Sequence, residues 1–159
     1  MIRYLISSFS FFCLSLFVPQ HAHALLGCSV SALPMSFVAY NPASGSDRDA
    51  STSVTVSCID IILPNTPYEL TLSSGGSGDI NNREMSSIGT SDTLAYQIYT
   101  DATYTQVWGD NTTGVSISGT VVSLLVTGAD TQFIYGRIPG GQFVESGIYS
   151  DNLIITVTY

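Results

Sequence analysis

The amino-acid sequence predicts an all-β protein built as an antiparallel β-sandwich, and three observations lead to this prediction. Short runs of alternating apolar and polar residues recur along the chain, as is typical of strands with one buried face. The segments between them are rich in glycine, asparagine and serine, which form turns. Strands at this spacing favour a sandwich or a barrel, and a disulfide near the start of the domain favours the sandwich.

The first 24 residues are predicted to be a secretory signal peptide. Arg3 precedes an almost unbroken apolar run from Tyr4 to Val18, and Ala22-His23-Ala24 has the form of a cleavage site. The apolar run is short for a membrane span, and no later stretch resembles one. We therefore expect a single domain over residues 25–159, exported and without stable insertion in a membrane.

The cysteine count predicts one disulfide. Cys13 lies in the expected signal peptide, which leaves Cys28 and Cys58 in a compartment where disulfides form. Alternation in CSVSA and VTVSC places each sulfur on the apolar face of its strand. Closing this loop would stabilise the fold by roughly 3–4 kcal/mol in the chain-entropy model.

A second interpretation of Cys28 is a lipid anchor. The residues LLGC at 25–28 resemble a bacterial lipobox, whose cysteine carries the lipid. Against this interpretation, PQHAH interrupts the apolar run that should lead into a lipobox, and Cys58 would be left unpaired.

The expected strands follow in order from the alternating runs. YELTLSS places Tyr68, Leu70 and Leu72 on one face, and LAYQIY does the same with alternate residues. The last run is the most regular, with apolar side chains at every second position from Leu153 to Tyr159. The predicted strands are 28–32, 53–58, 67–73, 94–99, 115–118, 121–127, 131–138 and 148–159.

The charge composition argues against binding to nucleic acid. The chain has a formal net charge of −8, with 12 acidic residues and four basic ones. Loss of the signal peptide with Arg3 makes the protein one unit more negative. Nucleic-acid binding requires basic side chains that displace counterions from phosphates, so neither this function nor attachment to an anionic membrane is expected.

The expected mature chain shows no active-site motif, although a glycosidase-like pair of carboxylates remains possible among its 12 acidic residues. Both histidines lie in the signal peptide and lysine is absent, which excludes a Ser-His-Asp triad, a Cys-His pair and an imidazole metal site. GGSGD is interpreted as a hairpin loop, DRD at 47–49 and WGDN at 108–111 as solvated turns, and Arg137 as a structural arginine. We expect no enzyme activity, no cofactor and no metal ion.

Several motifs, in this order and spacing, are similar to the spore coat protein U domain family, which includes the Csu-type subunits of archaic chaperone–usher pili. Val38 stands where that family usually has glycine. The similarity covers residues 28–159, through CSVSALPMSFVAYNP, VTVSC, YELTLSSGGSG, REM, LAYQIYTD, VWGDN, YGRIPGGQ and SGIYSDNLIITVTY.

The resemblance implies an immunoglobulin-like sandwich that lacks its final strand. A groove beside the last strand would be filled first by a periplasmic chaperone and then by a β-strand from the neighbouring pilus subunit. Its floor would consist of Leu153, Ile155, Val157 and Tyr159. Burying four such side chains gives roughly 6–12 kcal/mol before ordering costs. The alternative is that these residues are ordinary core of a closed sandwich.

The resemblance further implies a non-catalytic subunit of a Csu-like pilus, handled by a chaperone and an usher, at the cell surface and serving attachment or biofilm formation. Only Leu25-Leu26-Gly27 precede Cys28 after cleavage, so we expect a subunit that accepts a strand without donating one. The alternative function is a self-complete secreted coat protein or carbohydrate-binding module. Its aromatic ligand face would be drawn from the nine tyrosines and Trp108.

Overall fold

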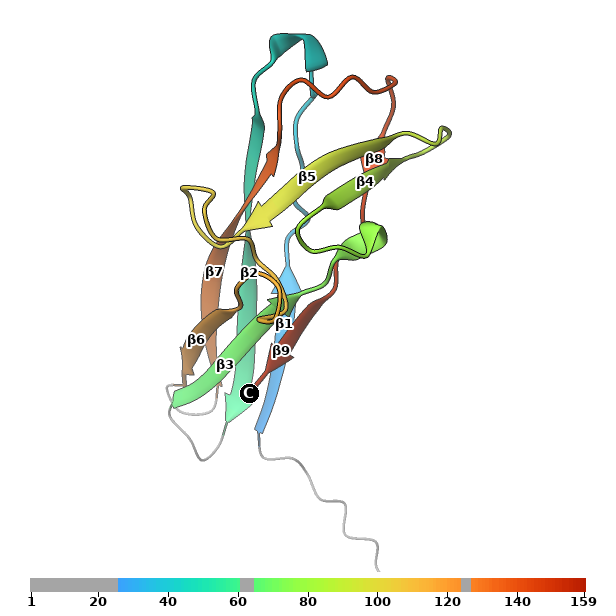
Figure 1. Ribbon diagram of the computed structural model, residues 1–159. Coiled ribbons are helices and arrows are strands. Elements are labelled where there is room, and N and C mark those ends of the chain that lie inside the picture. Colours follow the sequence, from blue (N-terminus) through green and yellow to red (C-terminus); the bar gives the residue numbers. More distant parts are fainter. Residues whose placement is uncertain (1–25, 61–64, 124–126) are drawn as a thin grey trace, which may run out of the picture.

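The fold was determined as a computed structural model that describes residues 26–60, 65–123 and 127–159 (Figure 1). The expected signal peptide lies outside the described residues. The described chain is almost entirely β-structure, and two short 3₁₀ turns, η1 (Pro42–Ser44) and η2 (Gly75–Ser77), interrupt it. Among these residues, no helix is long and apolar enough to cross a membrane.

The strands form two sheets in which all paired neighbours are antiparallel, which confirms the predicted all-β sandwich. Alternating apolar residues point into the space between the sheets. The larger sheet contains, in spatial order, β1 (Leu26–Ala32), β2 (Arg48–Asp60), β7 (Thr127–Ile138), β5 (Thr93–Tyr99), β4 (Arg83–Ser87) and β8 (Tyr149–Ser150). The smaller contains β6 (Ile117–Val122), β3 (Asn65–Leu72) and β9 (Ile155–Thr158).

Several predicted strand boundaries were wrong: β2 begins at Arg48 and β7 at Thr127, five and four residues before the predicted starts. The runs 115–118 and 121–127 were expected as two strands, but β6 continues through Gly119, where a side chain would collide with the hydroxyl of Tyr68. Residues 124–126 of the second run lie outside the described residues. The run 148–159 was expected as one strand, but it divides into β8 and β9. Between them Asp151 turns inward and accepts hydrogen bonds, so the intervening residues leave the ladder. Strand β4 was not predicted.

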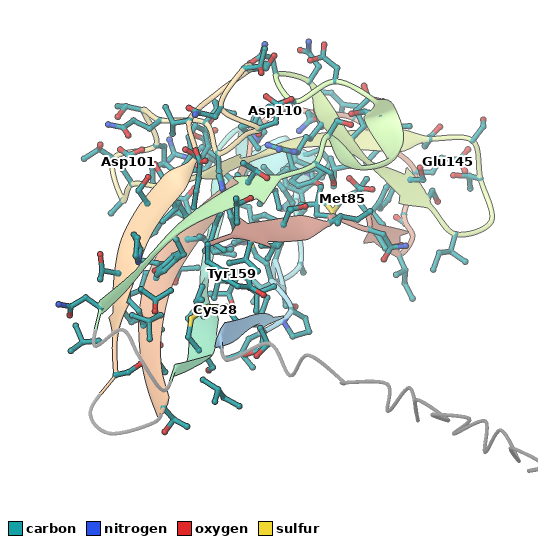
Figure 2. All side chains as sticks on the ribbon, turned by 90° about the horizontal axis from the view of Figure 1, so that it is seen from below. Cys28, Met85, Asp101, Asp110, Glu145 and Tyr159 are labelled. Atoms are coloured by element: carbon teal, nitrogen blue, oxygen red, sulfur yellow. A yellow bond between two sulfur atoms is a disulfide. The ribbon has the colours of Figure 1, made fainter. Side chains whose placement is uncertain are left out.

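The predicted disulfide is present. Cys28 and Cys58 are directly opposed partners of β1 and β2, with their Cα atoms 4.1 Å apart, and their sulfurs are bonded (Figure 2). Cys58 is buried and Cys28 packs against the core. Because the disulfide uses the sulfur that a lipid anchor would require, the structure supports the disulfide interpretation of Cys28.

The core between the sheets contains one aromatic and one charged residue that are both fully buried, Trp108 and Arg83. The indole N–H of Trp108 donates to the carbonyl of Leu70 at 3.2 Å. The guanidinium of Arg83 donates to the carbonyls of Ser73 and Trp108, and to the side-chain oxygen of Gln97. Burial lowers the pKa of Arg83, and these acceptors replace the water that a buried cation loses.

Candidate functional site: a groove between the two sheet edges

The two sheets leave their edges unpaired on one side of the sandwich. Strand β1 pairs only with β2, and β9 pairs only with β3, among the described strands. The two lie side by side in space, as Figure 1 shows, but belong to different sheets and do not pair with each other. Backbone groups on an unpaired edge remain available to another strand.

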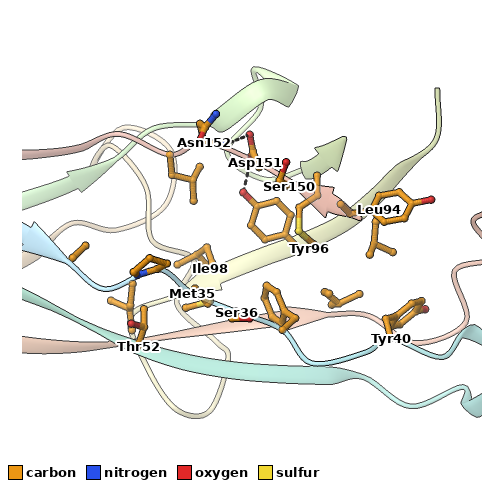
Figure 3. A pocket seen from close by; sticks show the side chains of 18 of the residues that line it. Met35, Ser36, Tyr40, Thr52, Leu94, Tyr96, Ile98, Ser150, Asp151 and Asn152 are labelled. Carbon is orange, nitrogen blue, oxygen red and sulfur yellow. Dashed lines mark hydrogen bonds between the residues drawn. The ribbon is translucent and has the colours of Figure 1, made fainter. Parts of the chain in front are cut away.

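A groove of about 650 Å³ opens beside these edges (Figure 3). One wall is the segment 32–40, which follows β1, and the other is the segment 147–155, which leads into β9. The groove reaches inward to buried core residues, including Trp108, Ile134 and Ile138. A groove of this volume falls within the range of about 300–1,000 Å³ that is typical of binding pockets.

The structure brings together some of the residues predicted to form a groove floor. Leu153 and Ile155 line the groove, and Val157 is half-buried against the same core. Tyr159 does not line it. Its side chain is 52% exposed at the end of the chain and lines a separate shallow depression with Pro67 and Thr120.

Sequence reasoning did not identify the opposite wall of the groove. Met35 and Phe37 point inward over β7, where Gly136 leaves room that a side chain would occupy. The ring of Phe37 packs edge-on against Tyr96, with their centroids 6.4 Å apart. Met35 and Phe37 alternate in PMSF, and this alternation is a signal for the wall. The stretch is not a strand in the structure. From the sequence it was interpreted only as part of a family motif.

Two buried tyrosines of the sandwich donate their hydroxyl hydrogens to aspartate side chains. The hydroxyl of Tyr68 donates to Asp130 at 2.7 Å, and that of Tyr96 donates to Asp151 at 2.6 Å. Burial and the neighbouring carboxylate raise the pKa of Tyr68 from 10 to about 12, and raise the pKa of Tyr96 further. Both phenols are therefore held neutral in the folded state.

We expect the free energy of unfolding to fall as the pH rises from 10 toward 12. In this interval the unfolded chain loses phenol protons that folded Tyr68 retains, so deprotonation favours the unfolded state. Denaturant unfolding at a series of pH values measures this slope. The variant Tyr68→Phe should show a smaller slope, and an unchanged slope would contradict the assignment.

The charged residues that the sequence offered as possible catalytic or metal-binding groups form hydrogen bonds and ion pairs within the fold. Arg137 donates to both carboxylate oxygens of Asp49 at 2.7 and 2.9 Å, lowering the pKa of Asp49, and its guanidinium lies 3.7 Å from the ring centre of Tyr104. The structural role predicted for Arg137 is confirmed. The DRD segment was expected to be a solvated turn, but its two carboxylates pair with this arginine. The carboxylate of Asp110 accepts from the backbone of its own turn.

The glycine-rich segment GGSGD forms the 3₁₀ turn η2 beside the groove. Asp79, at its end, accepts from the backbone of Asn81 and from the side chain of Asn82. Within residues 26–60, 65–123 and 127–159, no group of three or more cysteine, histidine or acidic side chains is placed to hold a metal ion. The candidate functional site is the groove between the segments 32–40 and 147–155.

Comparison with known proteins identifies relatives in sequence and in fold. A family model described as the Spore Coat Protein U domain matches residues 14–156. Protein U of Myxococcus xanthus is 30% identical over 125 residues, which cover 77% of this chain and 66% of that protein. The chain thus spans just under two thirds of the length of this relative.

A solved structure shares the fold at lower identity. It is the crystal structure of the CsuC–CsuE chaperone–tip adhesion subunit pre-assembly complex from archaic chaperone–usher Csu pili of Acinetobacter baumannii. One of its chains aligns with a TM-score of 0.54 and 18% identity, over 85% of this chain and 40% of that chain. This likeness concerns the architecture of the sandwich.

Proposed function

The chain belongs to the spore coat protein U domain family, and from this premise we propose that it is a non-catalytic structural subunit that accepts a β-strand from a partner protein. The subunit would assemble by donor-strand complementation into a Csu-like pilus at the cell surface. It would leave the cytoplasm through its signal peptide and reach a periplasmic chaperone and an usher. Its role would be attachment or biofilm formation.

The observation that carries this proposal is the groove that opens into the core. The core residues at its base are buried, but the apolar side chains on its walls, Met35, Phe37, Leu153 and Ile155, are only half-buried. The groove lies between the segments 32–40 and 147–155, which adjoin β1 and β9, and each of these strands has one unpaired edge among the described strands. An extended segment placed there could hydrogen-bond along an edge while its alternate side chains enter the groove.

The walls of the groove define the chemistry of the occupant. Met35 and Phe37 on one wall, and Leu153 and Ile155 on the other, present apolar side chains. A strand with large apolar residues at every second position fits this lining, because side chains of period two point to one face. We therefore propose a neighbouring subunit as the donor, after a chaperone strand has occupied the same position.

The experiment that tests this proposal fills the groove from within the same polypeptide. Residues 25–159 are exported to a periplasm without a partner, with and without an alternating apolar strand joined after Tyr159 by a flexible linker. We expect the fused protein to give a higher yield and a higher melting temperature, because the added strand buries the open core. A fusion with polar residues at the inward positions is the matched control.

The opposite result would favour the alternative function. If the unfused protein is a stable monomer and the apolar strand raises its melting temperature no more than the polar control does, the sandwich completes itself. The chain would then act as a self-complete coat protein or carbohydrate-binding module, and the strand-acceptor proposal would lose its physical basis.

A further inference from the structure

Asp151 occupies an unusual place in the groove wall. It lies between β8 and β9, in the segment where the ladder is interrupted, and its side chain points to Tyr96 (Figure 3). One carboxylate oxygen accepts from the backbone N–H of Gly76 at 2.9 Å and from that of Asn152 at 2.8 Å. The other accepts from the hydroxyl of Tyr96 at 2.6 Å. The carboxylate thus joins its own segment to the 75–77 turn and to Tyr96 of β5.

The backbone conformation of the 75–77 turn allows it to lie in contact with Asp151. Gly75 has φ +72°, a conformation that favours glycine, and a Cβ there would collide with the carboxylate of Asp151. The same Cβ would approach a methyl group of Leu153 at 2.9 Å. The 75–77 turn therefore lies directly against the connection between β8 and β9, with no room for a side chain at position 75.

The same turn is anchored to the core on its other side. The N–H of Ser73 donates to the carbonyl of Ile154 at 3.0 Å, and the N–H of Ile154 donates to the hydroxyl of Ser73 at 2.9 Å. The carbonyl of Ser73 accepts two hydrogen bonds from the buried guanidinium of Arg83, at 2.7 and 3.2 Å. The buried guanidinium of Arg83 thus holds Ser73 in place, and Ser73 in turn pairs with Ile154 of the groove wall.

These contacts determine where the apolar side chains of the wall lie. Leu153 and Ile155 follow Asp151 by two and four residues, so an anchored carboxylate sets their direction toward the groove. We propose that Asp151 is a positioning residue of the strand-binding groove: its carboxylate holds the connection between β8 and β9 against the 75–77 turn and Tyr96, so that Leu153 and Ile155 line the groove before a partner strand arrives. This inference rests on the proposed strand-acceptor function.

Loss of the Asp151 carboxylate should reduce the affinity for a partner strand more than it reduces the free energy of unfolding. A groove whose wall is already ordered requires less ordering when a strand binds, and preorganisation of this kind increases affinity. Loss of the carboxylate would leave β3 and the buried core in place, while the wall would have to become ordered during binding.

The molecule contains a matched control for this inference. Tyr68 and Asp130 form a second tyrosine–aspartate hydrogen bond, of 2.7 Å against 2.6 Å for Tyr96 and Asp151. Tyr68 is buried like Tyr96, but it and Asp130 do not line the groove. Tyr68→Phe therefore removes this hydrogen bond, together with the one that the hydroxyl accepts from Gln132, without touching the groove wall.

The test measures binding of a labelled synthetic peptide of alternating isoleucine and threonine to the exported protein. The variants are Asp151→Asn, Tyr96→Phe and the control Tyr68→Phe, each checked for its folded state by circular dichroism. Asn retains the size of Asp but not its second carboxylate oxygen, and Phe retains the ring of Tyr96. We expect Asp151→Asn and Tyr96→Phe to bind the peptide about tenfold more weakly than wild type, the effect of one charge-assisted hydrogen bond. Tyr68→Phe should bind as wild type does.

Each outcome has a definite meaning. Wild-type affinity in both groove variants, or an equal loss in Tyr68→Phe, would overturn the positioning role, because the effect would then be absent or would follow stability alone. If Asp151→Asn does not fold, Tyr96→Phe decides the question by itself. Failure of the wild-type protein to bind the peptide would instead overturn the strand-acceptor function, and the positioning role with it.

Discussion

Deletion of residues 153–159 should prevent the protein from folding. The deletion removes β9, whose Ile155 and Val157 are the ladder partners of Leu72 and Leu70 in β3. Both leucines are almost completely buried, and the truncation would expose them on that side. The loss of burial and of the ladder is on the order of 5 kcal/mol or more, which is comparable to the whole stability of a small domain. Circular dichroism and periplasmic yield measure the result.

A smaller deletion provides the control for this truncation. Removal of Tyr159 alone takes away a side chain that is 52% exposed and lies outside the groove, so stability should change by about 0.5 kcal/mol or less. A folded protein after deletion of 153–159 would show that β3 does not need β9. A large effect of deleting Tyr159 alone would show that this residue has a role in the fold beyond the contacts described above.

The variant Trp108→Ala should lose about 3–5 kcal/mol of stability, the cost of removing a large aromatic side chain from a core. Trp108 is fully buried, and its indole N–H donates to the carbonyl of Leu70, which the substitution would leave without this donor. Thermal or denaturant unfolding measures the loss. Phe143→Ala is the control, because Phe143 is 83% exposed and its removal should change stability by about 0.5 kcal/mol or less.

This result also bears on the alternative function. The sequence placed Trp108 among the residues of an aromatic ligand face, whereas in the structure it belongs to the core. A loss of ligand binding in Trp108→Ala would therefore report unfolding and would not identify a ligand contact. If Trp108→Ala retained wild-type stability, the position of Trp108 in the core would be wrong.

The alternation of apolar residues over 153–159 predicts the position of some of these side chains and not of others. Alternation predicts correctly that Leu153, Ile155 and Val157 share an apolar face, because side chains of a strand alternate between two faces. It assigns Tyr159 to the same set, yet the structure ends β9 at Thr158 and leaves Tyr159 largely exposed. A local pattern does not reveal where pairing stops, since β9 ends at Thr158 although its partner β3 continues to Asn65.

Local features of the sequence are enough to predict the fold class and the disulfide. Alternation is a property of neighbouring residues, and if Cys13 belongs to a signal peptide, as predicted, the two remaining cysteines can pair in one way. Folding is needed to show that β1 and β9 lie side by side with unpaired edges, that a groove between the segments 32–40 and 147–155 reaches the core, and that Asp151 anchors its wall. The contacts responsible join residues far apart in the chain, such as Asp151 with Gly76, and Arg83 with Trp108. An aspartate in YSDN and a glycine in SSGG have the appearance of ordinary turn residues, because the partners that give them a role are brought near only by folding.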